Sequence, residues 1–341
     1  MPTYVITGGA GFIGCNTGRR VLEAGHRLVV VDNLSRKGAR ANLTWLQEHG
    51  GLLFEEADVR DAAAMERILG PLGDDDVVIH LAGQVAVTTS VANPREDFEI
   101  NAGGAVNVLE AVRQSGAKPL LINASTNKVY GGMDKAAVLE HSTRYAYRDL
   151  PHGVSEDTPL DFHSPYGCSK GAADQYFHDY SRIYGLPTVV LRQSCIYGPR
   201  QFGVEDQGWL AWFAIAAVLG RSVTIYGNGK QVRDVLHVDD LTQAFMLAAD
   251  SKDKVAGGVY NVGGGPEHTM SVWAEFGPIL EELVGCSLDV RFGPWRPGDQ
   301  PVYVSDIRQI ERDLGWRPEV TVRAGIERLV RWVRENRSLF E

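Results

Sequence analysis

Short apolar runs recur along the amino-terminal part of the chain, and stretches with helical periodicity separate them. The runs that predict β-strands are residues 4–7, 28–31, 52–55, 77–80, 120–123 and 188–192. They are almost continuously apolar, as expected for strands of a parallel sheet that helices cover on both faces. Strands that alternate with helices are typical of βαβ units. The sequence therefore predicts an α/β protein with a Rossmann-type, doubly wound parallel sheet.

The pattern becomes less regular after Tyr197-Gly198-Pro199. It predicts a helix over 209–219, short strands over 223–226 and 288–292, and a terminal helix over 322–336. A helix over 238–249 and a strand over 258–262 are expected to return to the first domain, so that the boundary is interleaved. We expect one domain from residues 1–195 with about 236–262, and a smaller mixed α/β carboxy-terminal lobe from residues 196–235 and 263–341.

The stretch 131–159 is the longest one without clear periodicity. Long loops inside compact domains usually serve a function or are disordered. Because this stretch ends close to Tyr166, we interpret it as an ordered loop near the functional site. Disorder is the alternative.

Composition excludes several classes of protein. The four cysteines form no C-x-x-C pair and the nine histidines show no metal-ligand spacing, so we expect reduced thiols, no metal and a cytoplasmic location. The chain has no apolar run long enough to predict a membrane span. A formal net charge of -9 without a basic cluster disfavours a nucleic acid or an anionic membrane as partner.

A glycine-rich turn, Gly8-Gly9-Ala10-Gly11-Phe12-Ile13-Gly14, follows the first predicted strand and opens a helix. Such a turn allows the backbone to approach a pyrophosphate, and the helix amino terminus then faces the phosphates. Asp32 closes the second strand, where a carboxylate can bind the adenosine ribose and repel a 2'-phosphate. The sequence thus favours NAD over NADP. Arg36 and Lys37 are an alternative anchor for a 2'-phosphate.

Three residue types needed for reversible alcohol oxidation occur in the right order. Thr126 follows the fifth predicted strand, and Tyr166 precedes Lys170 by four residues in a helical stretch, which places both on one helix face. A nearby ammonium favours the phenolate, so Tyr166 can accept a proton from a sugar hydroxyl that Thr126 holds in line. We predict Thr126, Tyr166 and Lys170 as the catalytic residues.

With these motifs in place, the chain resembles the extended short-chain dehydrogenase/reductase family, specifically its nucleotide-sugar-modifying branch, over essentially all of its length. Further matching segments are Asn101-Ala102-Gly103-Gly104-Ala105, Tyr197-Gly198-Pro199, Arg233-Asp234 before His237-Val238-Asp239-Asp240, and Arg296-Pro297-Gly298-Asp299. One departure is Cys195, because many members have an asparagine there, near the sugar diphosphate. The resemblance implies bound NAD, a nucleotide-sugar substrate and a homo-oligomer, either a dimer or a tetramer.

The first domain is therefore predicted to bind NAD and the smaller lobe to bind the nucleotide sugar. The predicted NAD contacts are Gly8, Gly11, Phe12, Ile13, Gly14, Asp32, Asn33, Ser35, Arg36, Asp58, Val59, Leu81, Ala82, Gln84, Asn101, Ala124, Tyr166, Lys170 and Gln193. The predicted substrate contacts are Asn127, Lys128, His163, Ser164, Cys195, Gln201, Arg233, Arg296 and Asp299.

Arg233 and Arg296 match arginines that grip the nucleotide diphosphate in the resembled family, and guanidinium groups suit bidentate phosphate binding. From the residues alone, each arginine could equally lie on a solvated face or pair with Asp234 or Asp299. The arginines do not reveal which base the nucleotide carries.

Asn127 and Lys128 directly follow Thr126. The dehydratases of the resembled family carry an Asp-Glu pair there, which removes a proton and expels a hydroxyl group. Asparagine is not an acid, and lysine is a poor base unless its pKa is strongly lowered. Dehydration is therefore disfavoured. Oxidation at a sugar carbon followed by reduction from the other face, which is epimerisation, remains.

The segments 125–131, 161–170 and 206–209, with Gln201-Phe202, are similar to those of CDP-tyvelose (CDP-paratose) 2-epimerases. This resemblance implies inversion at C2 of a CDP-linked hexose. Two alternatives remain open. One is a nucleotide-sugar 4-epimerase, which would use the same three catalytic residues. The other is a non-catalytic NAD-binding regulator, although regulators of this kind tend to lose the tyrosine or the lysine, and both are present.

Overall fold

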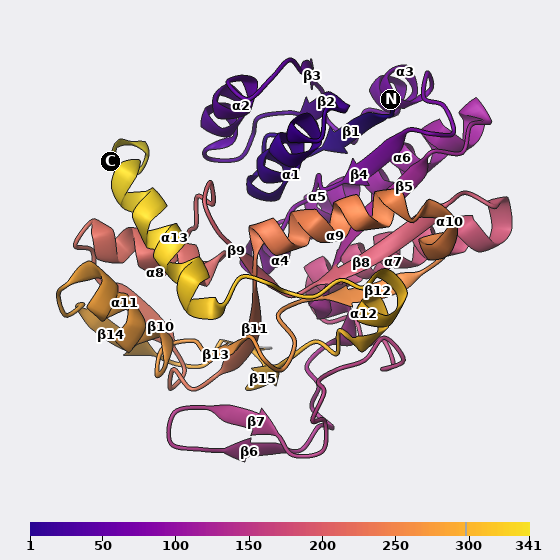
Figure 1. Cartoon of the computed structure of the whole chain (residues 1–341). Coiled ribbons are helices and arrows are strands. Elements are labelled where there is room, and N and C mark those ends of the chain that lie inside the picture. The colour runs from indigo at the N-terminus through magenta and orange to yellow at the C-terminus, as the bar shows by residue number, and fades with distance from the viewer. Residues whose placement is uncertain (297–298) are drawn as a thin grey trace.

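The computed structural model describes residues 1–296 and 299–341. Its centre is a parallel sheet of seven strands in the order β12-β8-β5-β4-β1-β2-β3 (Figure 1). These strands are β1 (Thr3–Thr7), β2 (Arg27–Asp32), β3 (Leu53–Glu56), β4 (Val77–His80), β5 (Leu120–Thr126), β8 (Thr188–Gln193) and β12 (Val259–Val262). The predicted doubly wound α/β fold is confirmed. As predicted, the strand near residue 260 returns to this sheet, where β12 pairs with β8.

Helices cover both faces of the sheet because successive strand residues point to opposite sides. In β1, Tyr4 and Ile6 belong to one buried cluster and Val5 to another. The first cluster includes residues of α1, α2 and α9, and the second includes residues of α3, α6 and α7. The helices and helical turns of this region are α1 (Phe12–Glu23), α2 (Ala39–Gln47), α3 (Ala62–Leu69), α4 (Val87–Ala92), α5 (Pro94–Phe98), η1 (Glu99–Gly103), α6 (Gly104–Ser115), η2 (Asn127–Tyr130), α7 (Ser164–Tyr184), α9 (Val238–Asp250), α10 (Lys252–Val255) and α12 (Arg308–Leu314).

The smaller lobe has its own core, which α8, α11 and α13 build together with short strands (Figure 1). Helix α8 is apolar almost all round, as expected for a helix buried inside a lobe. The elements of the lobe are β9 (Cys195–Tyr197), α8 (Trp209–Val218), β10 (Val223–Tyr226), β11 (Val232–His237), β13 (Thr269–Ser271), α11 (Phe276–Val284), β14 (Val290–Gly293), β15 (Val302–Tyr303), α13 (Val322–Glu335) and η3 (Arg337–Leu339).

The stretch 131–159 was expected to be a loop, but it contains an antiparallel hairpin of β6 (Val138–Glu140) and β7 (Tyr145–Tyr147). The hairpin lies at the lower edge of the molecule in Figure 1. It is fastened to the smaller lobe, because Arg144 binds the carboxylate of Glu275 at 2.6 and 2.7 Å. Three-residue strands are too short to show an alternating pattern, which is why the sequence did not predict them.

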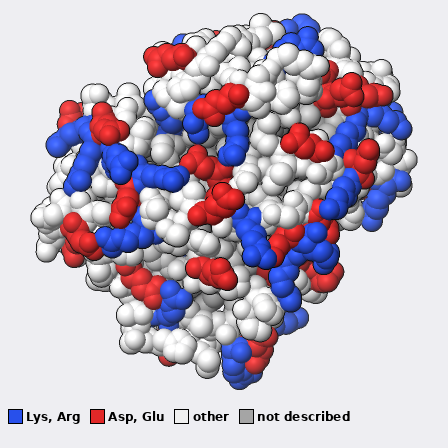
Figure 2. Space-filling view, viewed as in Figure 1, with Lys and Arg blue, Asp and Glu red and all other residues white. Residues whose placement is uncertain are grey.

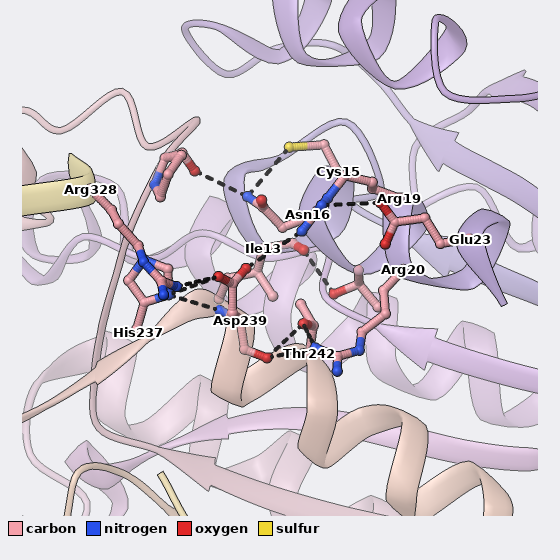
Figure 3. Close-up of polar contacts among 12 residues, drawn as sticks. Ile13, Cys15, Asn16, Arg19, Arg20, Glu23, His237, Asp239, Thr242 and Arg328 are labelled. Atoms are coloured by element: carbon pink, nitrogen blue, oxygen red, sulfur yellow. Dashed lines mark hydrogen bonds and ion pairs between the residues drawn. The ribbon is translucent and has the colours of Figure 1, made fainter. Parts of the chain in front are cut away.

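A polar cluster around Asp239 joins the two parts of the molecule (Figure 3). Asp239, in the first turn of α9, lies 3.1 Å from Arg328 on α13 and 3.5 Å from Arg19 on α1. Nearby, Asn16 of α1 donates a hydrogen bond of 3.0 Å to the carbonyl oxygen of Pro199. These contacts hold α1, which begins at the glycine turn, in a fixed place relative to the smaller lobe.

Acidic and basic side chains lie beside one another on the face shown in Figure 2. Exposed ion pairs, such as Arg323 with Glu282, occur on the surface of the molecule. Among the helices that the structure describes, none is both long and apolar enough to cross a membrane.

Candidate active site

A cavity of about 310 Å³ lies along the carboxyl ends of the central strands, where open α/β sheets bind their ligands. Eighteen of the nineteen residues predicted to contact NAD line it. They are Gly8, Gly11, Phe12, Ile13, Gly14, Asp32, Asn33, Ser35, Arg36, Asp58, Val59, Leu81, Ala82, Gln84, Ala124, Tyr166, Lys170 and Gln193. The structure thus brings together, in one cavity, segments that extend over more than half of the chain.

The glycine turn is shaped so that side chains would not fit. Gly8 has a φ of 70°, and a Cβ atom there would lie 2.7 Å from the backbone nitrogen of Ala82. A Cβ atom on Gly14 would collide with the carbonyl oxygen of Gly8. The turn therefore offers bare backbone at the start of α1, which suits a pyrophosphate.

Asp32 lies at the end of β2 and braces this turn. Its carboxylate accepts hydrogen bonds from the backbone N–H groups of Ala10 at 3.0 Å and Leu34 at 2.8 Å. Burial raises the pKa of Asp32, and these two hydrogen bonds oppose the rise. The carboxylate lines the cavity, so the position fits an adenosine ribose. Arg36 and Lys37 line the same end of the cavity, and Arg36 donates a hydrogen bond to Gln207.

Asn101 is the exception among the predicted NAD contacts, because it does not line the cavity. It is 2% exposed and lies behind the loop that carries Gln84. Its side-chain oxygen accepts a hydrogen bond of 2.9 Å from the Gln84 N–H group, and its amide nitrogen donates to the Gln84 carbonyl at 3.1 Å. Asn101 therefore holds a wall of the cavity, and the packed loop that carries Gln84 lies between Asn101 and the cavity.

A segment of the smaller lobe closes the cavity and was not predicted to do so. Arg200, Phe202, Gly203 and Gln207 line the cavity, and so does Gln201, which was predicted to bind the sugar. The guanidinium group of Arg200 lies 4.4 Å from the ring centre of Trp45 on α2. Sequence similarity had drawn attention to this segment, but only the folded chain shows that it crosses to α2.

Thr126 lies beside Tyr166, which lines the cavity together with Lys170. Thr126 is the last residue of β5, whereas Tyr166 and Lys170 lie one turn apart near the start of α7, and each is about 8% exposed. Lys170 donates a hydrogen bond of 2.6 Å from Nζ to the carbonyl oxygen of Ala124. The Thr126 hydroxyl interacts with the phenol of Tyr166 and lowers its pKa. The arrangement places a hydroxyl, a phenol and an amine around one point.

Burial dominates the electrostatics of this group. It raises the pKa of Tyr166, and the Thr126 hydroxyl opposes the rise. Burial also lowers the pKa of Lys170 to about 8, although the charges of Asp174 and Asp97 oppose the change. Desolvation disfavours the charged form of both groups. The prediction that the Lys170 ammonium favours the Tyr166 phenolate stays a prediction.

A buried ion pair joins the catalytic helix α7 to the central sheet. Arg192 of β8 binds the carboxylate of Asp174 on α7 at 2.9 and 3.0 Å, and the side chains are 5% and 0% exposed. Ser125, the neighbour of Thr126, donates a hydrogen bond of 2.6 Å to the same carboxylate. One carboxylate thus ties β5, β8 and α7 together. The sequence offered one signal for it, since Asp174 lies one helical turn beyond Lys170.

Four of the predicted substrate residues form a second group near Thr126. Lys128 lies near Arg233, Asp299 and Cys195, and each of these residues shifts the pKa of the Lys128 amine. Burial and the nearby Arg233 lower the pKa of Lys128 to about 8, and Asp299 and Cys195 oppose the shift. Burial raises the pKa of the Cys195 thiol. The group is a compact polar site beside the catalytic residues.

Gln300 completes this group and was missed by the sequence analysis. It is 1% exposed, its side-chain oxygen accepts a hydrogen bond of 3.4 Å from Lys128 Nζ, and its amide nitrogen donates to the carbonyl oxygen of Gly131. Arg233 donates to the Gln300 carbonyl at 2.8 Å and to Asp299 at 2.6 Å. Its position next to Asp299 was the only available signal.

The other predicted substrate residues have different surroundings. The Arg296 side chain lies over the ring of Tyr226 at 3.9 Å and pairs with Asp206 at 3.0 Å. Its backbone carbonyl oxygen accepts a hydrogen bond of 3.1 Å from the N–H group of Asp299, which belongs to the Arg233 group. His163 is exposed and precedes α7 without a side-chain capping bond. Ser164 accepts a hydrogen bond from the Gly167 N–H group, and Asn127 accepts one from Thr126. Pro297 and Gly298 of the predicted arginine motif lie outside the described residues.

Comparison with known proteins agrees with this geometry. The NAD dependent epimerase/dehydratase family matches residues 4–263. The CDP-paratose 2-epimerase of Salmonella typhi is 47% identical to this chain over 335 residues, which cover 96% of this chain and 98% of that protein. The chain belongs to the NAD dependent epimerase/dehydratase family. The predictions of an NAD cofactor and of a nucleotide-sugar epimerase are confirmed at this level.

Solved structures of the family show the same fold. The UDP-glucose 4-epimerase of Thermotoga maritima, solved with UDP-glucose, is 31% identical with a TM-score of 0.82 and covers 98% of this chain and 99% of that one. The dTDP-glucose 4,6-dehydratase DesIV of Streptomyces venezuelae, solved with NAD, is 30% identical with a TM-score of 0.84 and covers 99% of both chains. The family thus contains epimerases and dehydratases on one scaffold, so the side chains of the site must distinguish them.

Proposed function

We propose that the protein inverts C2 of a CDP-linked hexose, converting CDP-paratose to CDP-tyvelose or acting on a related CDP-hexose. The observation that carries the reaction type is the Thr126 segment. Thr126 meets Tyr166 and Lys170, while Lys128 and Asn127 take the place of an acid pair. The choice of C2 and of CDP is supported by the 47% identity to the CDP-paratose 2-epimerase of Salmonella typhi.

The cavity fits NAD because it combines bare glycine backbone at a helix amino terminus with the carboxylate of Asp32 at its far end. Residues of the glycine turn would hold the pyrophosphate and Asp32 the adenosine ribose. Bound NAD supplies a reversible acceptor for the two electrons and the hydrogen that leave the sugar carbon. The chemistry left to the protein is to move one proton and to hold the sugar.

Tyr166 is the group that moves the proton. As phenolate it accepts the proton of the C2 hydroxyl while the C2–H bond breaks, and it returns the proton when the ketone is reduced. Thr126 orients that hydroxyl, because its own hydroxyl already interacts with the Tyr166 phenol. Lys170 fixes the distance between α7 and β5 through its bond to Ala124. The same residues serve both half-reactions, so only the sugar face that is presented has to change.

Dehydration needs a base and an acid in addition. Burial lowers the pKa of Lys128 to about 8, which makes it a better base than an exposed lysine, but Asn127 supplies no acid. Asn127 is 7% exposed and accepts a hydrogen bond from Thr126. Lys128 is held beside Arg233 and Gln300. We infer that these polar groups bind the sugar and its phosphate and leave the keto sugar free to turn. In this proposal Arg233 and Arg296 bind the diphosphate. To do so, Arg233 gives up its ion pair with Asp299, and Arg296 gives up its ion pair with Asp206.

The test is to supply the purified protein with CDP-paratose and CDP-glucose that carry deuterium at C2. We expect inversion at C2 with the label retained, and Tyr166→Phe should abolish it while Tyr176→Phe, an exposed position on the same helix, should not. Inversion at C4 seen by product NMR would identify a 4-epimerase instead. Loss of the label to solvent would contradict direct return of the hydrogen. Turnover of neither sugar, despite bound NAD, would favour a non-catalytic role.

We also infer a homo-oligomer that buries α5 and α7. Helices α5 and α7 pack against each other, and large apolar side chains are exposed along them: Phe98 is 59%, Tyr176 46%, Ile183 66% and Tyr184 48% exposed. Large exposed apolar surfaces commonly mark protein interfaces. Sedimentation of the protein should give a dimer or tetramer, and Ile183→Glu should shift it to monomer. A monomeric wild-type protein would exclude this inference.

A cytoplasmic location is proposed on the state of the thiols. Cys15, Cys168, Cys195 and Cys286 are all free, and Cys168 and Cys286 are exposed. Exposed free thiols are typical of a reducing compartment. Fractionation of cells that make the protein, with detection by antibody, tests the proposal, and enrichment in an oxidising compartment would contradict it.

A further inference from the structure

The short helix α5 has one buried residue, and that residue is an aspartate. Asp97 is 0% exposed, whereas its neighbours Arg95, Glu96 and Phe98 face solvent. A helix with a single inward-facing position normally places an apolar side chain there. A buried carboxylate is costly unless it is well bonded, so its presence calls for a reason beyond packing.

Three neutral groups hold this carboxylate. Gln84 donates to its Oδ1 at 2.8 Å, Asn101 donates to the same oxygen at 3.2 Å, and Ser169 donates to Oδ2 at 2.5 Å. Among the described residues, no lysine, arginine or histidine forms an ion pair with Asp97. In the described part of the chain Asp97 thus has no cation in direct contact, in contrast to Asp174, which pairs with Arg192, and it acts on the Lys170 amine only through space.

The partners of Asp97 lie on the wall of the cofactor cavity. Gln84 lines the cavity, and Ser169 is the residue directly before Lys170 on the catalytic helix. Through its charge, Asp97 raises the pKa of both Tyr166 and Lys170. The carboxylate is thus close enough to act on the end of the cavity that Tyr166 and Lys170 line, yet it lies behind the wall and touches no ligand there.

We propose that Asp97 tunes the redox equilibrium of the bound cofactor. Its buried carboxylate stabilises the oxidised, positively charged nicotinamide relative to the neutral reduced ring. This inference rests on the proposed roles of Tyr166 and Lys170, which place the nicotinamide at that end of the cavity. The interaction is strong there because the interior has a low effective dielectric constant. An epimerase must end each turnover with oxidised cofactor. A field that favours that form lowers the fraction of cofactor that is reduced while the keto sugar, which takes the hydride back, is still bound.

A structural role alone would not require the charge. In Asp97→Asn, the amide oxygen can still accept from Gln84 and Asn101, and the amide nitrogen can donate to Ser169. The Ser169 hydroxyl can then donate to the Tyr166 carbonyl oxygen, from which it already lies 3.2 Å away. An asparagine would therefore anchor α5 to α7 about as well as the aspartate does.

The experiment is a reductive titration of the holoenzyme without sugar, which measures the midpoint potential of the bound cofactor by its absorbance. Removing one buried charge at this range should change the ratio of oxidised to reduced cofactor about tenfold, which corresponds to about 30 mV for two electrons. Asp97→Asn should therefore shift the potential to more positive values by about this amount. Glu96→Gln, which removes an exposed charge from the same helix, should leave it unchanged.

Asp97→Glu, which keeps the charge, and Asp97→Ser, a second neutral variant, complete the set in case the asparagine variant does not fold. The glutamate variant is expected to keep the wild-type potential and the serine variant to follow the asparagine one. An unchanged potential in a folded neutral variant overturns the proposal, and so does an equal shift in Glu96→Gln. Because no sugar is present, these outcomes are independent of whether CDP-hexoses are the substrates.

Discussion

Lys170 Nζ lies 2.6 Å from the carbonyl oxygen of Ala124, two residues before Thr126. This hydrogen bond fastens the catalytic helix α7 to the end of β5, and it is the only hydrogen bond recorded for the Lys170 amine in the described part of the chain. Lys170 therefore sets the distance between the threonine and the tyrosine, in addition to any effect of its charge.

Lys170→Met should lower kcat by roughly 10²- to 10⁴-fold, because it removes both the anchor and the ammonium from a general acid–base site. Bound NAD should also decrease, since Lys170 lines the cavity. Steady-state kinetics and the NAD content of the purified protein measure the two effects. Lys118→Met, at an exposed position, is the matched control, and full activity in Lys170→Met would contradict the assignment.

Lys128→Met should impair turnover while the protein keeps its NAD, because Lys128 lies in the polar group beside the catalytic residues and does not line the cofactor cavity. Lys135→Met, an exposed neighbour in the sequence, should have wild-type kinetics. If Lys128→Met turns over at the normal rate, the proposed sugar site is wrong.

The pH dependence of stability gives a separate test of Lys128. Its pKa is lowered to about 8 in the folded protein, below the ordinary value of 10.5, so the unfolded chain binds more protons between these pH values. Stability contributed by this group therefore increases as pH rises from about 8 to about 10. Over this pH range the melting temperature of the wild type should rise relative to that of Lys128→Met. Parallel curves of melting temperature against pH would contradict the lowered pKa of Lys128.

Asp32→Asn should weaken NAD binding by roughly tenfold and narrow the preference for NAD over NADP. The amide can accept only one of the two backbone hydrogen bonds that the carboxylate takes from Ala10 and Leu34, and it no longer repels a 2'-phosphate. Calorimetric titration of the cofactor-free protein measures both affinities. Asp75→Asn, an exposed aspartate, is the control.

Arg296→Gln should raise KM for the nucleotide sugar about tenfold with little effect on NAD content, because Arg296 contacts Tyr226 and Asp206 but not the cofactor cavity. Arg291→Gln, on the exposed strand β14, should leave KM unchanged. An unchanged KM in Arg296→Gln would show that this arginine does not bind the diphosphate.

Asp174→Asn should reduce the free energy of unfolding by about 3 to 5 kcal/mol, because it leaves the guanidinium of Arg192 buried without a counter-charge. Asp179→Asn breaks an exposed pair with Arg182 on the same helix and should cost less than about 1 kcal/mol. Denaturant unfolding of both variants provides the comparison. Similar losses in the two would mean that burial of the Arg192 pair carries no special energy.

Much of the fold could be predicted because its signals are local. The strands of the central sheet were predicted to within a few residues at each end, since buried parallel strands are continuous apolar runs. β5 is the informative deviation, because it continues through Thr126 although residues 123–126 are largely polar. Pairing with β8 extends the strand, and no local pattern reports a partner more than sixty residues away.

The sequence predicted the position of the cofactor cavity better than the residues that line it. The motifs located the cofactor cavity, but Asn101 proved to lie behind its wall and Gln201 proved to line it. Arg200 was missed because its partner, Trp45, lies on another domain's helix. Such contacts depend on how the smaller lobe packs against α2, which neither periodicity nor motif spacing describes.

The sequence by itself determined the order of the βαβ units, the glycine turn, and the presence of a threonine, a tyrosine and a lysine without an acid pair beside them. These features follow from local spacing and from residue chemistry. Only the tertiary structure decided that Lys128 meets Gln300, that Asp97 is buried against Ser169 of the catalytic helix, and that burial raises the Tyr166 pKa. Desolvation and charge proximity depend on residues far apart in the chain, so they come into existence only when the chain is packed.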